Sequence, residues 1–234
     1  MKKFIFKKEK QMAKTKTEKS SQNIRKLTTI AIMSAIGVIL QFVEVSIPIM
    51  PPFIKLDFSD LPELIVAFAY GPLSGVAVCF IRNVIHIAAT SSMAVGELSN
   101  FILGCFFCVP AGLIYKRNKS KKTAAIGALV GALCMAVICF PLNYFVIYPI
   151  YAQIMAGGDM GAIVSAYTAI LPSVTSLPKA LLIFNVPFTF IKGLIVAAIT
   201  FLVYKHISPI LHNTQPKKEL NQENKADEVK SEEE

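Results

Sequence analysis

Polar side chains inside otherwise apolar stretches are the residues of this sequence best able to do chemistry. Such groups are costly in hydrocarbon unless they are paired, hydrated or bound to a ligand. Lys192 is the strongest case, because it lies well inside the last apolar stretch. We expect its ammonium to meet a counter-charge or an acceptor on a ligand. The other members of this group are Gln41, Glu44, Asp57, Asp60, Glu63, Arg82, Asn83, Glu97, Asn100, Asn143 and Lys179.

Three carboxylates fall within the segment Asp57-Phe-Ser-Asp60-Leu-Pro-Glu63, and two interpretations of them stay open. One is a helix start, in which Asp60 is the N-cap and Glu63 takes the capping-box position. The other is a Mg²⁺ site for intramembrane phosphoryl or prenyl transfer, since paired carboxylates bind this ion. Such an enzyme would also need a second acidic cluster or a histidine nucleophile, for which only Glu97 and His86 are available.

Motifs for catalysis and metal binding are absent from the sequence. There is no G-x-x-x-x-G-K-[ST] phosphate loop, so the chain cannot hydrolyse ATP by that route. Nucleophile-elbow, kinase and zincin spacings are also missing. The five cysteines all lie in apolar stretches, where small buried packing residues are the expected role. We therefore predict no catalytic residue, no metal site and no cofactor.

The elements that must position the polar residues are membrane helices. Of the 234 residues, 54% are hydrophobic and only 17% charged, with a mean hydropathy of +0.55. This composition excludes a soluble globular enzyme, a disordered protein and a secreted disulfide scaffold. The basic residues cluster at 1–26 and 116–122, beside apolar stretches. Such clusters set topology and contact anionic lipid headgroups, so we expect no nucleic-acid partner.

Six apolar stretches are candidate helices, at about 27–48, 61–70, 73–90, 98–115, 123–148 and 180–204. The basic clusters place both termini and the 116–122 loop in the cytoplasm, so an even number of crossings separates them. The second stretch is cut short by Gly71-Pro72. The prediction is an all-α membrane protein, a six-helix bundle with a short second helix. Its parts are a basic cytoplasmic tail (1–24), a membrane domain (25–206) and a polar, disordered cytoplasmic tail (207–234).

A short second helix implies a cavity. Its terminal backbone groups cannot be satisfied by lipid, so they must be buried in protein or face water. We expect an outward-facing cavity bordered by the proline-rich 49–60 loop. The 86–97 connection can reach it, and so can the 149–179 connection, an apolar lid broken at Gly157-Gly158-Asp159.

Four motifs in order carry a resemblance to a known family. They are Lys55-Leu-Asp-Phe-Ser-Asp-Leu-Pro62, Gly96-Glu-Leu-Ser-Asn-Phe101, Phe140-Pro-Leu-Asn-Tyr144 and Pro187-Phe-Thr-Phe-Ile-Lys-Gly193. Over about residues 25–205 the chain resembles the substrate-binding S components of energy-coupling factor (ECF) transporters, specifically the riboflavin-specific ones.

The resemblance implies a bundle that binds riboflavin from outside as transported cargo. It places Asn143 and Lys192 around the flavin ring, and puts Thr189 where the family has an Asn. Asn185, one turn earlier, is the alternative reader of the ring's imide edge. Further expected substrate-binding residues are Leu56, Asp57, Glu97 and Asn100, of which Asp57 and Glu97 suit the ribityl hydroxyls.

The resemblance also implies partners. A membrane T subunit and two ATPase subunits would supply the hydrolysis that this chain lacks. Ala31 and Ala35 match the small-residue stripe by which the family contacts its scaffold, and Ser34 and Val38 extend it. The expected location is the plasma membrane of a bacterium.

Two alternatives stay open beside riboflavin uptake. One is an S component for another vitamin, such as thiamine, pantothenate or a queuosine precursor. The other is an intramembrane, Mg²⁺-dependent enzyme that uses the carboxylates of the 57–63 segment.

Overall fold

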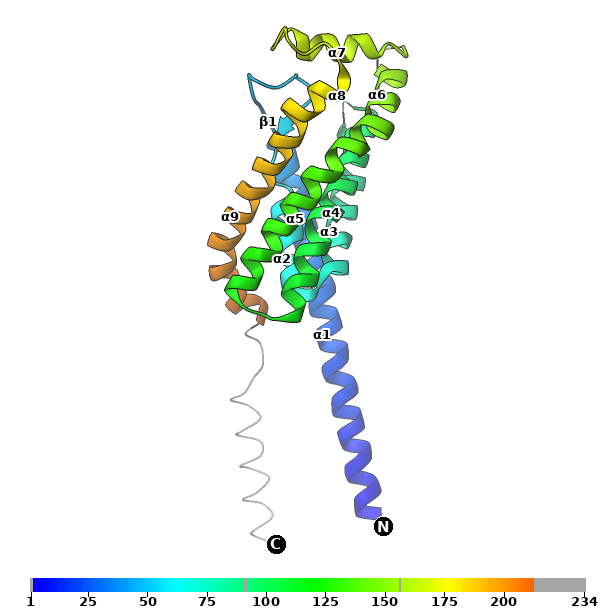
Figure 1. Ribbon diagram of the computed structural model, residues 1–234. Coiled ribbons are helices and arrows are strands. Elements are labelled where there is room, and N and C mark those ends of the chain that lie inside the picture. Colours follow the sequence, from blue (N-terminus) through cyan, green and yellow to red (C-terminus); the bar gives the residue numbers. More distant parts are fainter. Residues whose placement is uncertain (1, 91, 156, 213–234) are drawn as a thin grey trace. The chain divides into compact units, whose positions relative to one another are not determined.

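The computed structural model describes residues 2–90, 92–155 and 157–212, with side chains described for 20–90, 92–155 and 157–203. Contacts divide the chain into residues 1–200, which form the helix bundle discussed below, and residues 201–234. The elements of the described residues are mainly helices (Figure 1). In order they are α1 (Lys2–Phe42), β1 (Val45–Ser46), β2 (Lys55–Leu56), α2 (Asp60–Tyr70), α3 (Pro72–His86), η1 (Ile87–Ala89), α4 (Val95–Arg117), α5 (Lys121–Leu142), η2 (Asn143–Ile147), α6 (Tyr148–Met155), α7 (Met160–Thr168), α8 (Leu177–Ala180), η3 (Leu181–Asn185) and α9 (Val186–His212).

Five helical stretches of the described residues are long and apolar enough to cross a membrane. They are Ser20–Phe42, Pro72–Ala89, Val95–Arg117, Lys121–Met155 and Leu177–Val203. Helix α2 has only 11 residues, or roughly 16 Å at the α-helical rise, about half of a bilayer core. The prediction of a helical membrane bundle with a short second helix is confirmed.

The break between α2 and α3 follows from Gly71-Pro72. Gly71 has φ +94°, a backbone conformation that residues with a side chain rarely adopt. Its N–H still bonds to the carbonyl of Ala67 at 3.0 Å, which closes the last turn of α2. Pro72 then starts α3, where its missing N–H costs nothing.

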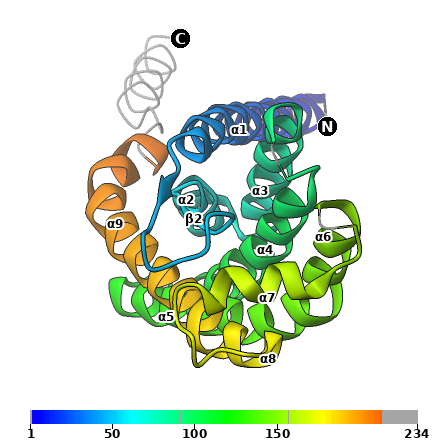
Figure 2. The same cartoon turned by 90° about the horizontal axis from the view of Figure 1, so that it is seen from above.

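The fifth helix extends further than predicted. It continues from α5 through η2 and α6 to Met155, and ends where Gly157 and Gly158 take positive φ. The 149–179 segment is therefore not a plain connection, because it holds α6 and the separate helix α7. Seen from above, α7 lies next to α6 and α8 (Figure 2). Ile163 and Tyr167 of α7 belong to one buried apolar cluster with Tyr148 and Leu181.

Two π-helical turns each lie just before a proline. Segment η2 ends two residues before Pro149, and η3 ends two residues before Pro187. A proline ring collides with the carbonyl four residues earlier, and a widened turn removes that collision. Asn143 begins the first π turn and Asn185 ends the second. These local irregularities therefore carry two of the predicted site residues.

Polarity is distributed inside-out relative to a soluble protein. Large apolar side chains such as Leu133, Phe145 and Leu202 are exposed, whereas Glu63 and Arg82 are fully buried. Helices α4 and α5 pack so closely that a side chain at Gly127 would not fit: a Cβ there would lie 2.8 Å from the carbonyl oxygen of Ala111 in α4. An apolar surface around a polar interior is the arrangement expected in lipid.

The predicted tail boundaries fall inside helices. Helix α1 begins at Lys2, so the basic segment before residue 25 continues directly into the first span. Helix α9 runs to His212, past the predicted boundary at residue 206. The remainder of the predicted acidic tail, 213–234, lies outside the described residues.

Candidate functional site

A cavity of about 750 Å³ lies at the end of the bundle where α2 begins. Its wall includes residues of the loop before α2, of the α3–α4 connection and of helix α7, as well as of α5 and α9. All three segments expected to reach a cavity contribute to its wall. The volume falls within the roughly 300–1,000 Å³ of small-molecule sites.

Seven of the eight predicted substrate-binding residues line this cavity. They are Asp57, Glu97, Asn100, Asn143, Asn185, Thr189 and Lys192. Leu56 is not among the lining residues. It lies in β2, half-buried and paired with Val45 of β1.

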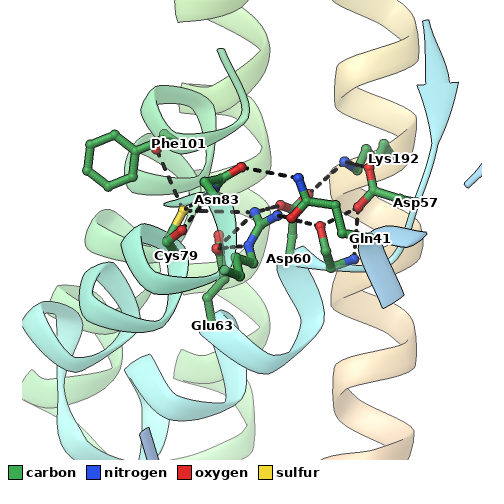
Figure 3. A network of polar contacts seen from close by, with 10 residues as sticks. Gln41, Asp57, Asp60, Glu63, Cys79, Asn83, Phe101 and Lys192 are labelled. Atoms are coloured by element: carbon green, nitrogen blue, oxygen red, sulfur yellow. Dashed lines mark hydrogen bonds and ion pairs between the residues drawn. The ribbon is translucent and has the colours of Figure 1, made fainter. Parts of the chain in front are cut away.

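Lys192 is held by two carboxylates at the cavity wall (Figure 3). Its Nζ lies 3.0 Å from Oδ2 of Asp57 and 3.1 Å from Oδ2 of Asp60, and the residue is 8% exposed. Burial opposes ionisation of Asp57, but the Lys192 ammonium and the Arg82 guanidinium lower the pKa of this carboxyl to about 2. The expected counter-charge for Lys192 is therefore present, and Lys192 is part of the cavity wall.

Arg82 pairs with one of these carboxylates, Asp60, and with a third carboxylate, Glu63. It is fully buried in α3, where its Nη2 donates to Asp60 at 2.6 Å and to Glu63 at 3.1 Å. Its Nη1 donates to Gln41 of α1 at 3.2 Å and also to the hydroxyl of Ser59. The network thus joins α1, α2 and α3 to α9 (Figure 3).

This network corrects the helix-cap interpretation of the 57–63 segment. Ser59, not Asp60, is the N-cap of α2, and it makes no side-chain cap hydrogen bond. Asp60 and Glu63 instead pair with cations. Because Arg82 and Lys192 occupy these carboxylates, they are poorly suited to bind Mg²⁺. Among the described residues no group of three or more acidic, His or Cys side chains is arranged to hold a metal.

Asn143 and Thr189 meet at Cys139. The Asn143 amide donates to the Cys139 carbonyl at 2.8 Å, and the Thr189 hydroxyl lies 3.3 Å from Cys139 Sγ. None of the hydrogen bonds described for the Asn143 side chain uses its amide oxygen Oδ1. Since Asn143 and Thr189 line the cavity, this oxygen is an acceptor available to a ligand.

The amide of Asn185 is already engaged by two tyrosines. Its Nδ2 donates to the hydroxyl of Tyr148 and its Oδ1 accepts from Tyr167, both at 2.7 Å. The two hydroxyls also bond to each other, which closes a triangle between α6, α7 and η3. Asn185 therefore positions the α7 segment in this structure.

Glu97 belongs to a polar cluster at another part of the wall. Its Oε1 lies 2.7 Å from Nδ1 of His86, and its Oε2 accepts from Ser92 at 3.0 Å. Asn100, one turn further along α4, also lines the cavity. This group of donors and acceptors suits hydroxyl groups on a ligand.

Aromatic side chains supply wall residues that sequence reasoning missed. The ring of Phe53 lies 5.6 Å from that of Tyr151 and 6.0 Å from that of Tyr148, and all three residues line the cavity. In the sequence Phe53 lies in the proline-rich 49–60 loop and the two tyrosines lie in apolar segments, so nothing marks them as site residues. Arg82, His86 and their partners were visible as polar residues, but the sequence did not show which of them pair.

Ala31 and Ala35 lie on the outer face of α1, where both are exposed. Between them Ser34 is buried, and its hydroxyl donates to the carbonyl of Ile30. Ser34 is therefore not part of the predicted smooth stripe. The exposed surface at this point is made by the two alanines and by isoleucines such as Ile32.

Comparison with known proteins gives concordant matches. A family model described as "ECF transporter, substrate-specific component" matches residues 25–204. "Riboflavin transporter RibU" of Staphylococcus aureus is 30% identical over 190 residues, which cover 81% of this chain and 94% of that protein. "Riboflavin transporter FmnP" of Bacillus subtilis is 31% identical over 189 residues, which cover 80% and 93%. A solved structure described as "Structure and mechanism of the S component of a bacterial ECF transporter" matches with a TM-score of 0.64 at 29% identity, covering 81% of this chain and 99% of its own.

Proposed function

This chain belongs to the substrate-specific components of ECF transporters, and on that premise we propose that it is the riboflavin-binding subunit of a vitamin uptake system. It is a membrane protein that binds a substrate, and it is not an enzyme. The two relatives reported above carry riboflavin transport in their names.

One observation carries the proposal: a cavity with aromatic walls also presents separate polar groups from several elements. A flavin has a flat, mostly apolar ring, an imide edge with one donor between two acceptors, and a polyol tail. Aromatic and aliphatic walls suit the ring, and a few placed polar groups can fix its orientation.

The polar groups can be assigned by chemistry. An ammonium has three N–H donors, and Asp57 and Asp60 accept from two of those of Lys192. The third is left for a ring carbonyl or ring nitrogen. The side-chain oxygen Oδ1 of Asn143 can accept a hydrogen bond from the imide N–H of the flavin. The Glu97 cluster lies where ribityl hydroxyls can both donate and accept.

Transport requires partners on this proposal. A membrane T subunit and two ATPase subunits supply the hydrolysis, and the bundle reorients in the membrane when they move. Riboflavin is the cargo, and the subunit uses no cofactor of its own. Both termini lie in the cytoplasm of a bacterium, beside the basic clusters that flank the apolar helices.

The direct test is an absorbance spectrum of the detergent-purified protein, which should show bound flavin. Titration of flavin-free protein with riboflavin, followed by quenching of flavin fluorescence, gives the dissociation constant. Lys192→Ala should raise this constant by at least about tenfold, because the ring loses a charge-assisted hydrogen bond. Ser74→Ala is the matched control, since Ser74 is buried in α3, its hydroxyl donates to the carbonyl of Tyr70, and the residue does not line the cavity. Colourless protein without riboflavin affinity would overturn the assignment.

The second candidate function is the binding of another vitamin, and one observation supports it. Thr189 stands where the resemblance implies an Asn, and its hydroxyl faces Cys139. A hydroxyl in place of an amide offers different hydrogen-bonding groups, so the site can bind a ring with a different polar edge. Mass spectrometry of the ligand released from purified protein separates the two candidates.

A further inference from the structure

Arg82 contacts a carboxylate of the cavity wall, Asp60, without lining the cavity itself. The residue is fully buried and is absent from the cavity wall, whereas Asp57, Asp60 and Lys192 are part of that wall. A buried guanidinium needs acceptors for its fixed fork of donors. They come from α2 (Asp60 and Glu63), from α1 (Gln41) and from Ser59, which immediately precedes α2. The resulting contacts determine how the wall residues face the cavity.

Each oxygen of the Asp60 carboxylate has its own cation. Oδ1 accepts from Arg82 Nη2 at 2.6 Å, and Oδ2 lies 3.1 Å from Lys192 Nζ. The bond to Arg82 therefore sets the rotation of the carboxylate, and with it the direction in which Oδ2 points.

Asp57 is oriented in the same way through one intermediate residue. Its Oδ1 accepts from the backbone N–H of Ser59 at 2.9 Å and from the Ser59 hydroxyl. That hydroxyl in turn accepts from Arg82 Nη1. Oδ2 of Asp57 is thereby left to face Lys192 at 3.0 Å.

Lys192 needs this support, because a lysine side chain is long and flexible and its ammonium is a point charge without preferred direction. Two oriented acceptors fix the position of Nζ and leave one N–H for a ligand. Without the guanidinium fork, Asp60 is free to rotate and draw the ammonium away from the cavity.

We propose that Arg82 is a positioning residue for riboflavin binding, which orients Asp57 and Asp60 so that they hold the Lys192 ammonium toward the ligand. This inference rests on the proposed function. It assigns part of the substrate affinity to a residue that does not touch the substrate.

A double-mutant cycle tests it, with riboflavin dissociation constants measured for the wild type, Arg82→Lys, Lys192→Ala and the double variant. Arg82→Lys keeps the buried positive charge but removes the fork. It should weaken binding by about tenfold in the wild-type background and by less than about twofold when Lys192 is already alanine. A purely structural role would weaken binding equally in both backgrounds, and that result overturns the inference.

A second cycle keeps the test decisive if Arg82→Lys does not fold. Ser59→Ala removes the hydroxyl that links Arg82 to Asp57 and leaves the charges of Arg82, Asp57, Asp60 and Lys192 in place. Its effect on affinity should also disappear in the Lys192→Ala background, whereas an undiminished effect contradicts the inference. Ser74→Ala should leave affinity unchanged in both backgrounds. Wild-type protein that binds no riboflavin overturns the proposed function and this inference with it, while wild-type binding without coupling overturns the inference alone.

Discussion

Asp60 connects the two cations of the buried network, because it pairs with both Arg82 and Lys192. Arg82 and Lys192 contribute two positive charges, while Asp57, Asp60 and Glu63 contribute three carboxylates. Glu63 Oε1 is buried and has no hydrogen-bond partner among the described residues. The three carboxylates are therefore not equivalent: among the described residues Glu63 pairs with Arg82, whereas Asp60 pairs with both Arg82 and Lys192.

This difference predicts that two isosteric substitutions lower the free energy of unfolding by different amounts. Glu63→Gln should change the free energy of unfolding by about 1 kcal/mol or less, because the amide oxygen can still accept from Arg82 Nε and Nη2 and the remaining charges balance. Asp60→Asn should cost roughly 3 kcal/mol or more, because it breaks buried ion pairs on two sides. Unfolding in mixed micelles measures both values. Equal costs would show that the network does not discriminate between these carboxylates.

At the scale of single elements, prolines shape the helices that border the cavity. The π turns before Pro149 and Pro187 shift the register between the residues on either side of them. Asn185 lies before the second proline, and Thr189 and Lys192 follow it on the same helical stretch. The proline thus sets how these side chains are arranged around the cavity.

Pro187→Ala should allow a regular α-helix to replace the widened turn and rotate Asn185 relative to Lys192. We expect riboflavin binding to weaken by about tenfold, which is the equivalent of roughly one hydrogen bond to the ligand. Pro110→Ala in α4 is the control, because Pro110 lies inside a helix but not on the cavity wall. Affinities from fluorescence titration compare the two variants, and an equal effect of both would contradict a specific role for Pro187.

The helices could be predicted from sequence because apolar stretches bounded by charges, Gly and Pro are local signals. The site could be predicted only in part. The cost of a buried ammonium showed that Lys192 needs a partner, but Asp57 is 135 residues away in sequence and nothing local identifies it. The triangle of Tyr148, Tyr167 and Asn185 likewise depends on how α7 packs. The capping interpretation of Asp60 failed because a long-range ion pair replaced a local hydrogen bond.

At the scale of the whole molecule, the ligand cavity and the exposed alanine face of α1 are separate surfaces. Ala31 and Ala35 are exposed on α1, and neither lines the cavity. We propose, from the resemblance to the family, that this face contacts the membrane scaffold. Small side chains there allow close approach of a partner helix.

Ala35→Phe should therefore separate binding from transport. Purified Ala35→Phe should bind riboflavin within about twofold of the wild type, because the substitution lies outside the cavity. Riboflavin uptake by cells that also express the T and ATPase subunits should fall strongly, since the larger side chain blocks close helix contact. Ile39→Phe, at an exposed position that already carries a large side chain, is the comparison. Normal uptake with Ala35→Phe would show that the partners dock elsewhere.

Helix α1 runs from Lys2 to Phe42 without a proline, and its last residues, Gln41 and Phe42, border the cavity. The helix contains no proline that would kink it, so Ala31 and the cavity rim are connected by one continuous helix. Gln41 also accepts a hydrogen bond from Arg82. On the proposed function, a partner that moves α1 at Ala31 would therefore also move one side of the substrate cavity.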